Sequence, residues 1–138
     1  MGPSLAGALR GARRSMNAGL SIHVMDATRN AVATGLRVEV YFLGEHAAKI
    51  CTSEVGAAGV VEDPALASGV IVPGEYEVVF HVGEFYRKRG VDMASIPFLD
   101  AVPFRFGIAE GLQHCRVPVR VSPWGFAAGR ECTDPEQP

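Results

Sequence analysis

Cysteine, net charge and long apolar runs are all scarce in this chain, and each scarcity excludes a class of protein. Its 138 residues hold three cysteines, Cys51, Cys115 and Cys132, with no CxxC spacing. We therefore expect neither a disulfide framework nor a structural zinc site, and a reducing cytoplasm fits best. A formal net charge of -2 gives no electrostatic reason to expect nucleic acid or an anionic membrane as a partner. No apolar run approaches the roughly 20 residues of a membrane span.

The chain does hold enough apolar residues for one packed domain. Hydrophobic residues make up 48% of the sequence, and the length suits one domain but not two. Segment 1–19 is rich in glycine, alanine and arginine and contains no acidic residue, so we expect a flexible leader there. We also expect a disordered tail at 133–138, which leaves 20–132 as the folded domain.

Apolar residues alternate with polar ones in five runs, as in strands that bury one face. Ile22 and Val24 point to one side of the first run, for example, and His23 points to the other. Turn-forming glycines, prolines and asparagines separate the runs, so the spacing predicts an all-β fold, an antiparallel β-sandwich. Segment 83–90 lacks the alternation and ends on Gly90, which predicts one short helix with a glycine C-cap. The alternating runs are 20–26, 36–43, 74–81, 102–108 and 114–122.

Pro118 lies inside the last of these runs. Proline cannot donate to a strand ladder, so either that strand lies at a sheet edge or this position faces away from a partner. An exposed edge invites pairing with another chain, and small sandwiches with such edges often assemble symmetrically.

Several blocks, in order, resemble the transthyretin-like 5-hydroxyisourate hydrolase family. The stretch LSIHVMD (20–26) is similar to the family's opening strand, usually Leu-Ser-Thr-His-Val-Leu-Asp. GEYEVVFHVGEFYRKRGV (74–91) resembles its strand-then-helix segment, and PFLDAVPFRFGIAEGLQHCRVPVRVSPW (97–124) resembles its closing strands. The resemblance covers residues 20–132.

The resemblance implies a two-sheet sandwich with one short helix, assembled as a homotetramer that is a dimer of dimers. It implies active sites in a channel between the dimers, with no metal and no other cofactor. Members of the hydrolase branch open a ring of a planar purine-derived substrate by water attack on a carbonyl. Transthyretins share the fold but bind a hormone in the equivalent channel without catalysis, so fold alone leaves the function open.

Only some of the family's polar site groups have matches here. His23 matches the histidine of the opening motif, and it lies on the face that points away from the core of its own sandwich. The family's essential turn arginine falls on Ala57. In the family's His-x-His-Val-Pro run the first histidine survives as His114, but the second is replaced by Arg116. Arginine cannot act as a general base, although it can bind a carboxylate or stabilise an oxyanion.

The family ending Tyr-Arg-Gly-Ser falls on residues 129–132, where Arg130 alone matches. Cys132 could act as a nucleophile if a cation stabilised its thiolate, or it could be an inert thiol. Trp124 matches an aromatic position of the family ending and could line the channel. Arg120 shares a strand face with Arg116, and we interpret it as a solvated residue.

These losses predict poor 5-hydroxyisourate hydrolysis, because removing one oxyanion-stabilising group alone commonly costs about 10²–10³-fold in rate. We expect a repurposed enzyme that opens or closes a ring of a planar heterocyclic or aromatic substrate, with His23 transferring a proton. In this interpretation Arg116 holds an anionic group of the substrate, although Glu131 is an alternative partner for it. Two other functions stay open: a genuine 5-hydroxyisourate hydrolase of urate degradation, and a non-catalytic binder of small molecules.

Overall fold

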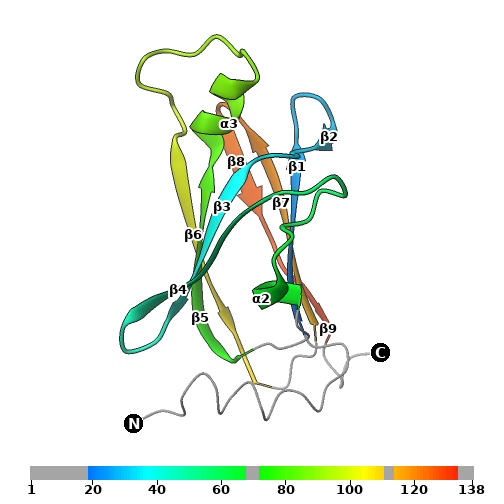
Figure 1. The fold of residues 1–138 in the computed structure, drawn as a ribbon, viewed down its shortest axis with the longest axis vertical. Coiled ribbons are helices and arrows are strands. Elements are labelled where there is room, and N and C mark those ends of the chain that lie inside the picture. The colour runs from blue at the N-terminus through cyan, green and yellow to red at the C-terminus, as the bar shows by residue number, and fades with distance from the viewer. Residues whose placement is uncertain (1–18, 68–71, 111–113, 134–138) are drawn as a thin grey trace.

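The computed structural model describes residues 19–67, 72–110 and 114–133, although it describes only the backbone of residues 67, 132 and 133. The predicted leader and tail therefore fall mainly outside the described residues. Within them, no helix is long and apolar enough to cross a membrane. Two sheets face each other across the core of a sandwich (Figure 1).

The first sheet, sheet A, has the order β2-β1-β7-β8, with β9 also paired to β7. The second, sheet B, has the order β4-β3-β5-β6. The strands of sheet A are β1 (Gly19–Asp26), β2 (Ala31–Val32), β7 (His114–Ser122), β8 (Gly125–Ala128) and β9 (Glu131–Thr133). The strands of sheet B are β3 (Arg37–Leu43), β4 (Ala47–Glu54), β5 (Gly74–His81) and β6 (Ala101–Ile108).

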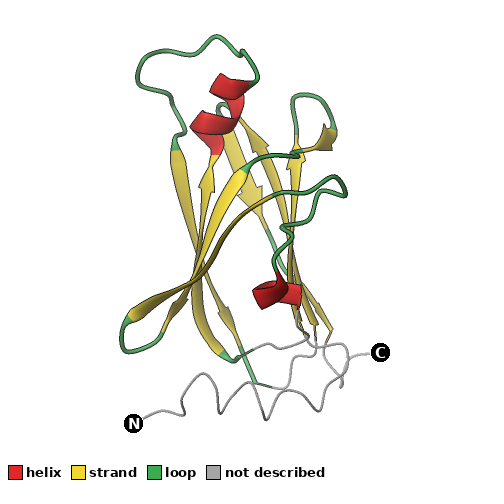
Figure 2. Cartoon of the chain, in the orientation of Figure 1, coloured by secondary structure: helices red, strands yellow, loops and turns green. Residues whose placement is uncertain are grey.

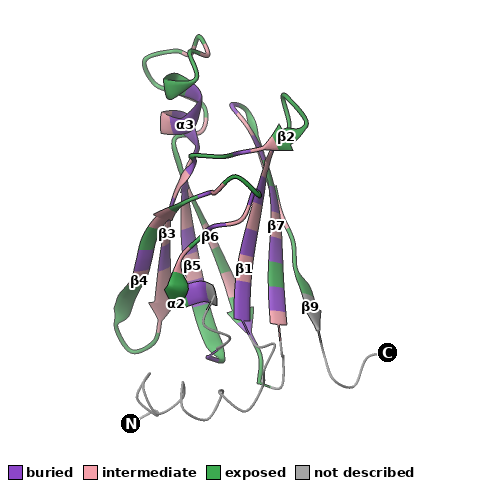
Figure 3. Ribbon diagram, turned by 45° about the vertical axis from the view of Figure 1, so that its right-hand side comes forward, coloured by how far each residue is buried: buried purple, intermediate pink, exposed green. Residues whose placement is uncertain are grey.

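The two-residue period of the sequence becomes the burial pattern of the strands. Ile22 and Val24 of β1 are fully buried, whereas His23 between them is only half-buried. Strand β7 alternates in the same way, with Val117 and Val119 buried (Figure 3). Burying the alternate apolar residues of both sheets against each other supplies the main stabilising term of such a fold. The predicted all-β sandwich is thereby confirmed.

One strand pair differs from the expected antiparallel arrangement, because β1 and β7 run parallel. The other strand pairs of the described chain are antiparallel. Parallel neighbours need a long crossover, and here most of the domain lies between the two strands in sequence. Strand β7 is central and not at an edge, because it pairs with β1 on one side and with β8 and β9 on the other. The carbonyl of Pro118 accepts a hydrogen bond from the N–H of Gly129, which lies in the gap between β8 and β9. The nitrogen of Pro118, which has no hydrogen to donate, therefore faces a place where the β7 ladder is interrupted.

The predicted helix is confirmed as α3 (Val82–Lys88), which caps one end of the sandwich (Figure 2). Gly90 follows it with a φ of 77°, a left-handed conformation that glycine adopts at low cost. Buried Tyr86 anchors the helix, because its hydroxyl donates to Oδ1 of Asp26 at 2.7 Å. A second helical turn, α2 (Pro64–Ala67), was not predicted; it lies beside β1.

The sequence predicts no disulfide framework, but it did not foresee that Cys115 is disulfide-bonded. Cys51 is a free, buried thiol, and burial raises its pKa to about 11. Sequence spacing could not reveal the bonded state, since the neighbours of a cysteine are set by strand pairing. The cysteine-based argument for a reducing compartment therefore loses its basis.

Candidate functional site

Strand register brings three of the predicted site residues, His23, His114 and Arg116, together on the outer face of sheet A, the face turned away from sheet B. In the parallel pair, His23 lies opposite Pro118, and Ser21 lies opposite Arg116. His114 begins β7 opposite Gly19. Since side chains alternate along each strand, Ser21, His23, His114 and Arg116 all project from this one face.

Ser21 links the two histidines of this face. Its Oγ lies 3.1 Å from Nε2 of His114 and 3.3 Å from Nε2 of His23. A serine hydroxyl has one proton, so it can donate to one imidazole while accepting from the other. The arrangement is a chain of hydrogen-bonding groups that joins two imidazoles through one hydroxyl. No described residue hydrogen-bonds to Nδ1 of His23, which leaves that nitrogen available to water or a ligand.

Arg116 is paired within its own chain. Its Nη1 donates to Oε2 of Glu131 at 2.9 Å, across the β7–β9 pair. The side chains of Arg116 and Glu131 are 44% and 60% exposed, so the pair is worth about 1 kcal/mol or less. The guanidinium next to His23 is therefore partly neutralised by an acidic neighbour that a ligand could displace.

The pKa of His23 is lowered from its ordinary value of 6.5, and burial is the largest cause. The positive charge of Arg116 and the neighbouring His114 lower it further. Glu131 acts in the opposite direction. A lowered pKa keeps the imidazole neutral near pH 7, the state in which it can accept a proton.

Ala57, the position that the resemblance matches to the family's turn arginine, is exposed in the turn that leads to segment 59–61. That segment pairs with the free edge of β1: Val61 donates to the Ile22 carbonyl, and Val60 bridges to His23. The turn thus lies beside the His23 strand. It offers no cation there, because alanine has none.

Two predicted residues, Arg130 and Trp124, do not join this cluster. Arg130 lines a cavity of about 160 Å³ at the sandwich edge together with Phe104 and buried Val117, away from the outer face of sheet A. Trp124 is 69% exposed in the turn between β7 and β8. The side chain of Cys132 lies outside the described residues, so the two alternatives for it, a nucleophile or an inert thiol, both stay open.

Sequence reasoning missed Ser21. It placed this residue on the same face as His23, but it could not place His114 beside it, because that contact depends on the parallel pairing of β1 with β7. The sequence signal that could have pointed to Ser21 was its position two residues before His23, which puts both side chains on the same face of the strand. Glu131 was foreseen only as one alternative partner for Arg116, and the structure shows that contact.

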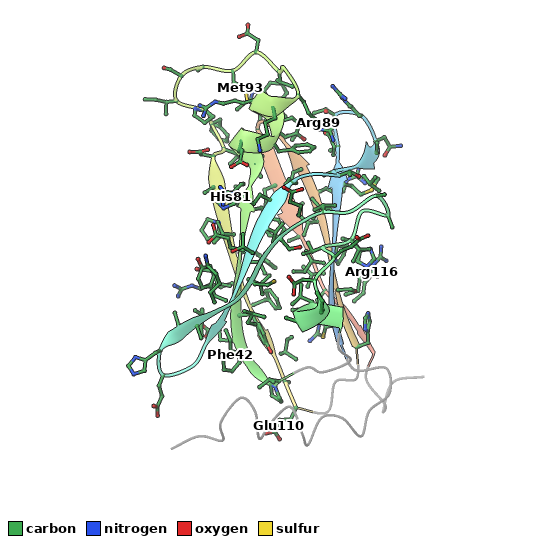
Figure 4. All side chains as sticks on the ribbon, viewed as in Figure 1. Phe42, His81, Arg89, Met93, Glu110 and Arg116 are labelled. Carbon is green, nitrogen blue, oxygen red and sulfur yellow. The ribbon has the colours of Figure 1, made fainter. Side chains whose placement is uncertain are left out.

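A second polar cluster lies on the outer face of sheet B and is separate from the first (Figure 4 labels His81 and Arg116 on opposite sides). Arg37 donates to Nδ1 of His81 at 3.3 Å, and Nε2 of His81 lies 2.7 Å from Oε1 of Glu39. Hydrogen bonds from Tyr41 and then His81 lower the pKa of Glu39 to about 2. Each group has partners within the cluster, so we interpret it as a stabilising network.

Neither cluster has the composition of a metal site. Among the described residues, no group of three or more histidine, cysteine, aspartate or glutamate side chains is arranged to hold a metal ion. The chemistry that the outer face of sheet A offers is that of imidazole, hydroxyl, guanidinium and carboxylate groups.

Comparison with known proteins gives this geometry a context. Residues 20–130 match the HIUase/Transthyretin family. The chain is 37% identical over 112 residues to 5-hydroxyisourate hydrolase 2 of Rhizobium meliloti (strain 1021), covering 80% of this chain and 93% of that protein. It is 35% identical over 112 residues to the 5-hydroxyisourate hydrolase of Pseudomonas aeruginosa, covering 80% of this chain and 89% of that protein.

The solved structures that are similar to this one include an allantoin synthase and a 5-hydroxyisourate hydrolase. The crystal structure of (S)-allantoin synthase superposes with a TM-score of 0.74 and 32% identity, over 85% of this chain. This chain spans just under half of that protein, because only 45% of the synthase is covered. The 5-hydroxyisourate hydrolase of Klebsiella pneumoniae superposes with a TM-score of 0.67 over 83% of this chain and 98% of that one. At 19% identity, the second likeness shows the fold alone.

Proposed function

The chain belongs to the HIUase/Transthyretin family, and from this membership and the outer face of sheet A we propose a cofactor-independent enzyme that opens or closes a ring of a planar heterocyclic substrate. The single observation that carries the proposal is the His23–Ser21–His114 chain. Two imidazoles joined by a hydroxyl can move a proton, which both directions of the reaction require.

The proposed path of the proton follows the hydrogen bonds. His23 takes a proton from water or substrate at Nδ1 and releases the proton on Nε2 to Oγ of Ser21. The hydroxyl proton of Ser21 passes to Nε2 of His114. His23 and Ser21 each lose one proton and gain another, whereas His114 gains one N–H bond and becomes a cation. The net result is one proton moved from the substrate side to His114. The lowered pKa of His23 suits the role of base.

We propose that 5-hydroxyisourate itself is a poor substrate. The turn position that carries arginine in the resembled hydrolases is Ala57, and the guanidinium of Arg116 is engaged with Glu131. A cation free to stabilise a developing oxyanion is therefore lacking at both positions, at a cost of about 10²-fold or more for each such group.

The proposed assembly is a homotetramer in which the outer face of sheet A meets a second copy. In one protomer this face is open, since the Arg116 side chain is 44% exposed. Covering it with a second sheet would exclude water and form a channel for a planar ring, which strengthens charge interactions inside it.

The test begins with freshly generated 5-hydroxyisourate, whose decay is followed by absorbance with this protein, with the Pseudomonas aeruginosa hydrolase, and with neither. We expect decay at least about 100-fold slower with this protein than with that relative. The same protein is then incubated with a panel of purine- and pyrimidine-derived heterocycles, and products are detected by mass spectrometry. A substrate that turns over equally fast with wild type and His23→Ala would overturn the proposed role of His23.

A second candidate is 5-hydroxyisourate hydrolysis at full rate. It is favoured by one observation: the outer face of sheet A keeps two imidazoles, because His114 joins His23 through Ser21. If 5-hydroxyisourate decays as fast with this protein as with the Pseudomonas aeruginosa relative, this candidate is established and the proposed repurposed reaction is wrong. Binding of heterocycles with no product from any of them would favour a non-catalytic binder.

A further inference from the structure

Arg120 shares the outer face of sheet A with the two histidines, one further step along β7. The register sets Arg120 opposite Met25 on one side and Ala127 on the other. Pro118, which lies opposite His23, separates it from Arg116. Two residues of strand span about 7 Å, so His23 is flanked at similar distances by Arg116 toward one end and by Arg120 toward the other.

The two arginines differ in what they contact. Arg116 donates to Glu131 at 2.9 Å, whereas Arg120 makes no hydrogen bond or ion pair with any residue that the structure describes. Arg120 is also exposed. An anionic ligand that bound Arg116 would have to displace Glu131, but one that bound Arg120 would displace only water. The unpaired guanidinium is therefore the stronger anion site on this face.

The surroundings of Arg120 leave room for a flat ring. Ala127 lies across the strand pair from it and presents a single methyl group, and β8 begins with Gly125. The ring of Pro118 fills the step between His23 and Arg120 with a low apolar surface. A planar heterocycle lying over Pro118 could reach the imidazole at one edge and the guanidinium at the other.

We propose that Arg120 determines specificity by binding the carboxylate of a planar heterocyclic ligand on this face. The inference rests on the proposed function, because it names the class of molecule that the same face takes. It reassigns the anion-binding role that the sequence suggested for Arg116. Guanidinium and carboxylate pair through two parallel hydrogen bonds, so the preference is for a planar acid over the same ring without the acid.

The experiment is calorimetric binding of two probes, orotate and uracil, which share a pyrimidine ring and differ by a carboxylate. We expect the wild-type protein to bind orotate about tenfold or more tightly than uracil. Arg120→Gln should bind the two probes equally. Arg120→Lys should keep part of the preference, since lysine retains the positive charge but lacks the paired N–H donors of a guanidinium. Arg105→Gln is the matched control, because Arg105 is exposed on sheet B and paired with Glu77.

Three results would overturn the proposal. The first is a wild-type protein that shows no preference for orotate, including one that binds neither probe. The second is an Arg120→Gln protein that keeps the full preference. The third is a preference removed by Arg116→Gln but not by Arg120→Gln. Binding is measured without turnover, so failure here leaves the proposed reaction intact, and a protein that binds orotate through Arg120 but transforms no heterocycle overturns only the proposed function.

Discussion

Arg116 and Glu131 form a 2.9 Å ion pair beside His23, and the two charges act on that imidazole in opposite directions. Arg116→Gln removes a cation, so we expect the pKa of His23 to rise. Glu131→Gln removes an anion, so we expect it to fall. Because burial is the largest cause of the lowered pKa, neither variant should restore the ordinary value fully. Titration of the His23 Cε1 proton by NMR measures both shifts, and Arg105→Gln should leave the titration unchanged. Shifts of the same sign in the two glutamine variants would contradict this geometry.

Ser21 is predicted to act through the two histidines that it joins. Ser21→Ala should lower turnover of the identified substrate by about 10- to 100-fold without unfolding the protein. Ser21→Thr keeps the hydroxyl and suits a strand, so it should restore most of the rate. A second measurement does not depend on the substrate: nitrogen-15 NMR reports which ring nitrogen of each histidine carries the proton. The alanine variant should change this tautomer balance, and an unchanged spectrum together with an unchanged rate would remove Ser21 from the site.

Glu39 should contribute to stability in a defined range of pH. Its pKa is lowered to about 2 from an ordinary value of 4.5, chiefly by the hydrogen bond from Tyr41. For a carboxylate with a lowered folded-state pKa, the stabilisation is complete above the unfolded-state value and is lost as the pH falls toward the folded-state value. The free energy of unfolding should therefore fall between about pH 4.5 and about pH 2.

In the Glu39→Gln variant, the free energy of unfolding should fall less steeply over that pH range. Some fall should remain, because Glu84, whose pKa is also about 2, contributes there too. Urea unfolding at a series of pH values measures the effect. Glu45, exposed in the turn between β3 and β4, supplies the control Glu45→Gln. Parallel curves of unfolding free energy against pH for wild type and Glu39→Gln would mean that the Glu39 carboxylate adds no pH-dependent stability in this range.

Two glycines with similar positive φ values predict different costs of substitution. Gly59 and Gly90 have φ values of 84° and 77°, so alanine is strained at either, by about 1 kcal/mol. A Cβ at Gly59 would also lie 2.6 Å from Cγ1 of Val32, whereas nothing lies within 4 Å at Gly90. Gly59→Ala should therefore destabilise the fold by about 1–3 kcal/mol more than Gly90→Ala, as measured from urea midpoints. Equal losses of stability in the two variants would contradict this prediction, because they would mean that segment 59–61 shifts at no cost to accommodate the added Cβ.

Much of the fold could be predicted because the signals are local. The alternation of Ile22 and Val24 with His23 follows from the period of a strand. The left-handed Gly90 just beyond the end of α3 follows from the needs of a helix C-terminus. The parallel pairing of β1 with β7 could not be predicted in this way, since no turn joins the two strands. The disulfide of Cys115 could not be predicted from the sequence for the same reason.

The sequence by itself determined which face of each strand carries polar groups, because side-chain direction alternates along a strand whatever its neighbours are. It thereby put His23 on one outer surface of a sandwich, and His114, Arg116 and Arg120 together on another strand face. Only the tertiary structure decided which of these residues meet. Register between strands far apart in the chain brought Ser21 to His114 and Glu131 to Arg116, and left Arg120 without a partner among the described residues. Contacts of this kind depend on distances through space, which the order of residues along the chain does not contain.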